Sequence, residues 1–128
     1  MKPPALAPAL HERTSGMMNL RLFAAHARLA ATREEMAPLV EAHVAFLVEL
    51  ERAGALFASG PFFDQAGAPT GDGMTIVRAE SITAARALLE RDPFVQAGVR
   101  TFELREWHLM EGTIVLTVRA SARAGLLT

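Results

Sequence analysis

Apolar residues along the chain gather in short runs, and four of these runs have the composition of β-strands. Residues 20–26 are mostly apolar, residues 55–59 are short and apolar, and residues 74–79 are rich in β-branched side chains. Residues 99–109 alternate between polar and apolar positions. Patterns of this kind predict strands that are buried on at least one face.

A second period, of three to four residues, predicts a helix from residue 33 to about residue 53. Its apolar stripe contains Met36, Val40, His43, Leu47 and Leu50, widened by Leu39, Val44 and Phe46. Thr32 and Glu35 have the spacing of a capping box, which predicts the helix start. Gly54 predicts the end, and Pro38 lies in the first turns, where a missing N–H is tolerated.

A second, shorter helix is predicted over residues 82–90. Ser81 is expected to be its N-cap, and Asp92-Pro93 is expected to end it. Three apolar residues of this helix are expected to face inward, namely Ala85, Leu88 and Leu89.

The predicted elements follow one another as strand, helix, strand, strand, helix, strand. This order is the split βαβ pattern of ferredoxin-like α+β folds, with a four-stranded antiparallel sheet and two helices on one face. A hairpin turn at residues 111–112 and a C-terminal tail strand at 113–118 are expected to follow. We therefore divide the chain into a flexible N-terminal extension (1–16), a domain (17–110) and a tail (111–128).

The predicted strands carry apolar residues on both faces. In the first strand, Leu20, Leu22 and Ala24 alternate with Phe23 and Ala25. Helices on one side leave the other face to be covered by something else. A second copy of the chain is the simplest cover, so we expect a homodimer.

The composition narrows the classes of function. The 128 residues fit one domain, and the absence of cysteine excludes disulfides, zinc–cysteine sites and a thiol nucleophile. A formal net charge of −1 with interspersed signs argues against nucleic-acid binding. No run approaches the roughly 18 apolar residues of a membrane span, and prolines interrupt the N-terminus, so neither a span nor a secretory signal is expected. We expect a cytoplasmic protein.

His43 is the most informative single residue because it interrupts the apolar stripe of the first helix. Its imidazole is expected to face the sheet, where a buried ring needs a hydrogen-bond partner. Histidine titrates near neutral pH, which suits it to proton transfer. A core histidine bonded to a backbone carbonyl explains the same pattern, so both interpretations stay open.

Asp92 precedes Pro93 in the pattern of an N-cap followed by proline at the first helical position of a short turn. Gly98 is expected to end that turn. A capping carboxylate can also orient an imidazole and stabilise its charged form, which leaves the other ring nitrogen free as a general acid or base. The pattern therefore permits both roles at once.

The segment Ser59-Gly60-Pro61 follows the second predicted strand. Gly60 allows close approach of the backbone to a ligand or another chain, and Pro61 then turns the chain, although a tight turn alone explains the same residues. Residues 64–73 are rich in Gly, Pro and Asp, which predicts a loop. Asp64 is then either a solvated loop acid or part of a pocket mouth.

The other histidines are weaker candidates for chemistry. His26 and His108 lie at or near strand ends, and His11 lies in the extension. The spacings typical of metal ligands are absent, and the glycines of residues 67–73 lack the lysine and the strand–turn–helix context of a phosphate loop. We therefore expect neither a metal nor a cofactor.

Taken in order, several segments resemble the YciI (YCII-related) family. They are 41–47 on the first helix, 54–56 and 58–62 around the second strand, 81–85, 87–88, 92–94, 97–99 and finally 107–108. The resemblance covers roughly residues 18 to 110. A helical histidine, a Gly-Pro, an Asp-Pro and a late tryptophan are weak signals singly and fairly specific in this order.

The resemblance implies a ferredoxin-like domain that pairs into a dimeric α+β barrel. It also implies a pocket in which His43 and Asp92 form an acid–base dyad, with Ser59, Gly60 and Pro61 in the pocket wall. Some relatives look like lyases or dehydrochlorinases of small aromatic or lactone-like rings, and muconolactone isomerases share the architecture.

One departure from the family pattern concerns charge. Family members often carry an arginine shortly before the helical histidine, whereas Pro38-Leu39-Val40-Glu41 holds that place here. The resemblance therefore implies no anion-binding group in that segment.

Three function hypotheses compete on the sequence. The first is a cofactor-independent lyase, isomerase or hydrolase in which His43 moves a proton and Asp92 orients it. The second is a non-catalytic dimeric module that binds a small molecule or a partner protein. The third, an RNA-binding sheet, is disfavoured because the signature aromatic motifs are missing.

Overall fold

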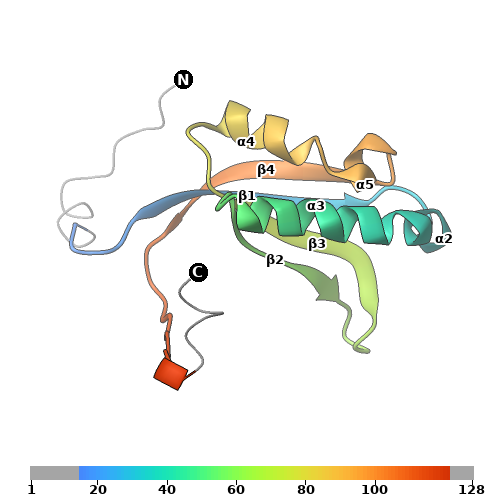
Figure 1. Cartoon of the computed structure of the whole chain (residues 1–128). Coiled ribbons are helices and arrows are strands. Elements are labelled where there is room, and N and C mark those ends of the chain that lie inside the picture. Colours follow the sequence, from blue (N-terminus) through green and yellow to red (C-terminus); the bar gives the residue numbers. More distant parts are fainter. Residues whose placement is uncertain (1–14, 122–128) are drawn as a thin grey trace. The chain divides into compact units, whose positions relative to one another are not determined.

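The computed structural model describes residues 15–121 (Figure 1). Most of the predicted extension (1–16) and the end of the predicted tail (122–128) lie outside these residues. Contacts divide the chain into two units, of which one is 19–109 and the other contains the flanking residues.

The unit 19–109 contains four strands and five short helical segments. They are β1 (Leu20–Leu29), α2 (Arg33–Met36), η1 (Ala37–Leu39), α3 (Val40–Arg52), β2 (Leu56–Phe63), β3 (Pro69–Val77), α4 (Ile82–Leu89), α5 (Pro93–Gln96) and β4 (Arg100–Leu109). The strands form one antiparallel sheet in the order β2-β3-β1-β4. This order confirms the predicted ferredoxin-like α+β fold. The sheet of the single chain is open, and closure into a dimeric barrel stays a prediction.

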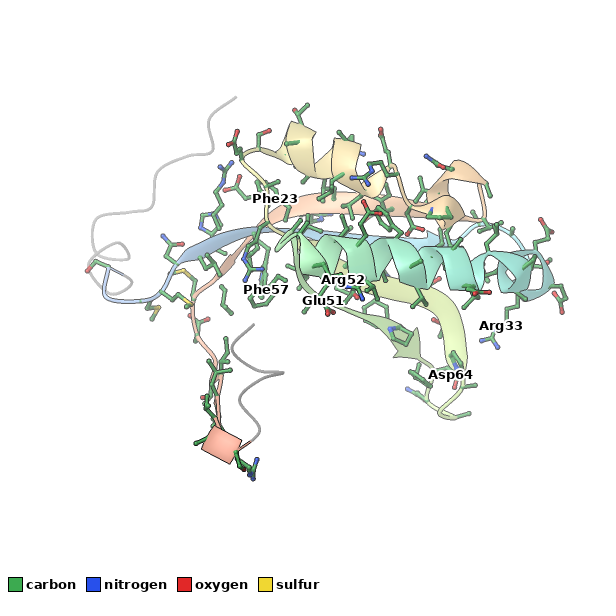
Figure 2. All side chains as sticks on the ribbon, in the orientation of Figure 1. Phe23, Arg33, Glu51, Arg52, Phe57 and Asp64 are labelled. Carbon is green, nitrogen blue, oxygen red and sulfur yellow. The ribbon has the colours of Figure 1, made fainter. Side chains whose placement is uncertain are left out.

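The core lies between the sheet and the helices. Figure 1 shows α3 and α4 lying along the sheet, and their buried side chains pack on its central strands. The cluster consists of Phe23, Ala25, Phe46, Leu50, Val77, Ala85, Leu89 and Leu104. Phe23, labelled in Figure 2, has no exposed surface. The register pairs Ala25 with both Thr75 and Leu104, so alternate residues of three strands share this face.

The first predicted helix is divided into three parts by its proline. Thr32 accepts a hydrogen bond from the Glu35 N–H at 3.1 Å, as the capping pattern predicts, and Gly54 follows the end of α3 with φ of 76°. Pro38 lacks an N–H, so the backbone passes through the 3-10 turn η1 before α3 begins at Val40. The prediction of one uninterrupted helix over 33–53 was therefore wrong at Pro38.

The hairpin of β2 and β3 extends further than predicted. Gly60 and Pro61 lie inside β2, and β3 begins at Pro69, so the turn is restricted to 64–68. A proline fits there because β2 is an edge strand, and its pairing is irregular between Pro61 and Phe63. The predictions of a chain turn at Pro61 and a loop over 64–73 were wrong.

In the other unit, residues 113–118 form no strand. A strand requires a hydrogen-bonding neighbour, and no described residue pairs with this segment. Ile114, Val115 and Leu116 are 63%, 79% and 87% exposed. The prediction of a tail strand is therefore wrong for the described chain. Over 15–121, no helix has the length and apolar character needed to cross a membrane.

Candidate functional site

A cavity of about 570 Å³ lies between the first helical region and the β2–β3 hairpin. The helical side is formed by α2 and α3, and side chains from α5 and β4 complete the cavity. Its lining consists of Met36, Val40, His43, Val44, Leu47, Ser59, Gly60, Pro61, Pro69, Gly71, Asp72, Gly73, Met74, Thr75, Phe94 and Arg100. Most of the lining is apolar and a few polar groups converge on it, which is the usual character of a small-molecule site.

His43 is held at the edge of this cavity by two contacts. Its Nδ1 lies 2.9 Å from Oδ1 and 3.0 Å from Oδ2 of Asp92, and both side chains are 12% exposed. Its ring stacks on the Phe94 ring with a centroid distance of 4.1 Å and an interplanar angle of 18°. The partner of the imidazole is thus a carboxylate and not the backbone carbonyl that the sequence left open.

Asp92 is placed by the short helix that it caps. Its Oδ1 accepts the Phe94 N–H at 2.9 Å, Pro93 occupies the first turn of α5, and Gly98 leaves the turn with φ of 74°. The predicted N-cap is confirmed. One carboxylate therefore serves the backbone and the imidazole together, and this double attachment restricts its orientation.

The Asp92 contact determines which nitrogen of His43 carries the proton. An ionised carboxylate only accepts hydrogen bonds, so Nδ1 carries the proton and Nε2 of the neutral ring is the acceptor. Within residues 15–121, Nε2 has no hydrogen-bond partner, and no buried side-chain nitrogen or oxygen is left without one. Nε2 is consequently accessible, and His43 lines the cavity.

Arg100 is a cavity residue that the sequence reasoning missed. It is only 8% exposed, and its Nε and Nη2 donate to the Gly71 carbonyl at 3.0 and 2.8 Å. Burial lowers the pKa of its guanidinium, and the negative charges of Asp92 and Asp72 act in the opposite direction. The alternation in β4 held a signal, because Arg100 shares a sheet face with the core residue Leu104.

The predicted pocket-wall residues separate into two groups. Ser59, Gly60 and Pro61 line the cavity, so the structure brings them together with His43. Asp64 is not part of the lining. Its Oδ1 accepts the N–H groups of Ala66 and Ala68 at 2.9 and 3.0 Å, at the hairpin tip labelled in Figure 2.

Two other described histidines, His26 and His108, lie apart from the cavity. His26 contacts the Phe62 ring, and His108 bonds to Asn19 and Glu106, each at 2.7 Å. His11 is outside the described residues. Over 15–121, no three His, Cys, Asp or Glu side chains are grouped as a metal site would require.

Comparisons with known proteins agree with the fold. The solved structure of 5-chloro-2-hydroxyhydroquinone dehydrochlorinase (TftG) from Burkholderia phenoliruptrix AC1100, in complex with 2,5-dihydroxybenzoquinone, matches with a TM-score of 0.56. The match has 22% identity and covers 67% of this chain and 92% of that one. No curated protein matches the sequence. The family model of the YCII-related domain matches residues 18–108, most of the chain. The chain therefore belongs to the YCII-related family.

Proposed function

We propose that the protein is a cofactor-independent lyase, isomerase or hydrolase for a small organic molecule. His43 is the general acid and base, and Asp92 orients it. The observation that supports this is the 2.9 Å contact between Nδ1 and the buried carboxylate, with Nε2 left accessible at a cavity of about 570 Å³. A positioned imidazole of this kind contributes about 10²–10⁴-fold to a proton-transfer step.

The proposed chemistry begins when Nε2 of His43 removes a proton from the substrate. A carbon next to a carbonyl, or a hydroxyl group, gives up its proton, and the ring becomes an imidazolium. Asp92 stabilises that charge through the Nδ1–H bond without taking the proton itself. The imidazolium then returns the proton to a different atom or to a leaving group, so that His43 ends the cycle neutral.

Ser59, Gly60 and Pro61 form the proposed wall for the substrate. The Ser59 hydroxyl has no hydrogen bond within residues 15–121, so it is available to a bound molecule. Asp64 is left out of the proposed pocket because its carboxylate is used by the turn.

The substrate class that we propose is a small ring. The cavity volume lies within the range of pockets for small molecules, and its apolar lining favours a flat unsaturated ligand. The solved dehydrochlorinase of like fold, bound to 2,5-dihydroxybenzoquinone, supports a ring of that size. Lactones and halogenated hydroxylated rings are accordingly the first candidates.

The test compares turnover by the wild-type chain and by variants. Lactones, β-keto compounds and chlorinated hydroquinones would be incubated in D₂O and followed by NMR for deuterium uptake, ring opening or chloride release. We expect His43→Asn to lower the rate about 10²–10⁴-fold with the fold retained, and the exposed-site control His108→Asn to leave it unchanged. Equal turnover by wild type and His43→Asn would refute the proposal.

A binding module without catalysis is the competing outcome of the same experiment. It would bind the ring compounds with no conversion, and His43→Asn would leave affinity largely intact. The mostly apolar lining suits such a module, whereas the oriented imidazole has no function in it.

We also propose that two copies associate through the sheet face opposite the helices. Phe62 and Trp107 are 39% and 41% exposed. The strand register and the contact between His26 and Phe62 place both on this face, together with the half-buried Ala24 and Met74. Light scattering after size exclusion would show twice the mass of one chain. A monomer at micromolar concentration would contradict the proposed dimer.

The cytoplasmic location stays a prediction.

A further inference from the structure

We propose that Arg100 makes the cavity selective for small ring compounds that carry an anionic group, such as a carboxylate or an enolate. This inference rests on the proposed function because it takes the cavity as the substrate site. It adds the charge of the ligand and the residue that recognises it.

The first argument is the placement of Arg100. Arginine is almost never fully buried without partners, because desolvation of its charge is unfavourable. Arg100 is 8% exposed, yet only Nε and one N–H of Nη2 have an acceptor, the Gly71 carbonyl. A guanidinium has five N–H donors, so the remaining donors are unused by described residues.

The nearby carboxylates do not use these donors. Asp72 accepts the Leu29 N–H at 2.8 Å, and Asp92 accepts from His43 and from the Phe94 N–H. Neither forms a hydrogen bond or close ion pair with Arg100 within residues 15–121, although both charges favour its protonated state. Both acids therefore use their hydrogen bonds elsewhere and leave the donors of Arg100 open.

At least one of the open donors is accessible. No buried side-chain nitrogen lacks a partner in the described chain, so the unbonded Nη1 must be accessible, and Arg100 is one of the cavity-lining residues. Gly73 keeps this side clear. A Cβ there would lie 3.3 Å from Nη2 and 3.6 Å from Nη1, in front of the guanidinium.

The cation and the base are arranged around one aromatic ring. The His43 ring centroid is 4.1 Å from that of Phe94, and the Arg100 Cζ is 4.9 Å from it. Both groups also line the same cavity, so one ligand bound there can meet both. The planar guanidinium fork matches a carboxylate or an enolate oxygen flanked by a second oxygen. The cation is supplied by β4, whereas residues 38–41 before His43 contain none.

The experiment measures binding of benzoate and of its neutral analogue benzamide to the full chain by NMR titration. We expect the wild type to bind benzoate about tenfold more tightly or better, because charge-assisted hydrogen bonds are the stronger ones. Arg100→Gln should abolish this preference. Arg105→Gln, on the same strand with an 81% exposed side chain, is the matched control and should retain it.

Two further measurements keep the test decisive. In the wild type, the NMR resonance of the Arg100 guanidinium should shift on addition of benzoate and not on addition of benzamide. This measurement does not depend on the folding of any variant. His43→Asn should keep the preference for benzoate, so that a failure of the catalytic proposal remains distinguishable from a failure of this one. Equal affinity for both probes, no benzoate binding at millimolar concentration, or a preference that survives Arg100→Gln would each overturn the inference.

Discussion

Replacement of Asp92 by asparagine should separate its two roles, because the amide can keep the cap while it removes the charge and one of the two oxygens beside Nδ1 of His43. Oδ1 accepts the Phe94 N–H, and asparagine retains an oxygen at that position. The second oxygen, 3.0 Å from Nδ1 of His43, becomes an NH₂ group that can only donate. Oδ1 also lies 2.9 Å from Nδ1 and can still accept from it, so the proton of the neutral imidazole is expected to divide between Nδ1 and Nε2. The fraction of rings whose Nε2 can accept a proton then falls.

The structure bounds the loss of stability. Asparagine and aspartate are similar N-caps, so the cap should change by only a few tenths of a kcal/mol. A charge-assisted bond worth about 1.5–3 kcal/mol is exchanged for a neutral one of about 1 kcal/mol, and the 12% exposure of both side chains limits screening. We expect a net loss of about 1–2 kcal/mol, or about 4–8 °C in Tm. Asp92→Ala should lose about 1 kcal/mol more because the cap is removed as well.

Two assays read these effects separately. Nitrogen-15 NMR of the histidine rings, at a pH where the ring is neutral, reports which nitrogen carries the proton. Urea unfolding reports stability. Asp64→Asn is the matched control, because Asp64 also accepts turn N–H groups but has no imidazole partner. A wild-type ring protonated on Nε2, or a tautomer unchanged in Asp92→Asn, would refute the reasoning.

Three further predictions follow from packing and charge. Gly73→Ala should destabilise the fold by about 1–3 kcal/mol, because the added Cβ would lie 3.1 Å from the Gly60 carbonyl oxygen. Gly60→Ala is the control, because a Cβ there has no atom within 4 Å. Equal urea midpoints for the two variants would contradict this prediction. Leu50→Ala should lower unfolding free energy by about 2–5 kcal/mol, since Leu50 is 2% exposed in the core, and a loss below about 1 kcal/mol would show that the site collapses. The hydrogen bond from Arg21 lowers the pKa of Glu106 below 4.5, so this pair stabilises the fold at neutral pH and the contribution is lost as the pH falls through the lowered pKa. Carbon-13 titration should show the Glu106 pKa rising in Arg21→Gln, and an unchanged value would contradict the assignment.

The order of elements could be predicted because each depends on local pattern. The stripe around Leu50 and the caps Thr32, Ser81 and Asp92 mark the helices, and all three caps form the expected hydrogen bonds. Boundaries were less accurate where glycine and proline occur. Pro61 reads as a turn, but in an edge strand its missing N–H faces no partner, which local sequence does not reveal.

The candidate site was predictable only in part. The inward direction of His43 follows from helical spacing, and the position of Asp92 follows from Asp-Pro. Their contact across 49 residues depends on how α3 and α5 pack, so the resemblance, and not the pattern, implied it. Arg100 was missed because the alternation in β4 indicates which sheet face it lies on but not whether that position is buried. Its environment is created by Gly71 and Asp72 from another strand.

Two glycines of β3 have a consequence for how the ligand preference of this protein can diverge. A side chain at Gly71 would lie 2.7 Å from Leu29, and one at Gly73 would meet backbone, so these positions resist change during evolution. Val40 and Val44 across the cavity are 44% and 49% exposed and carry little of the core. New specificities should therefore arise by substitution on the α3 side, while the β3 glycines are inherited with little alteration.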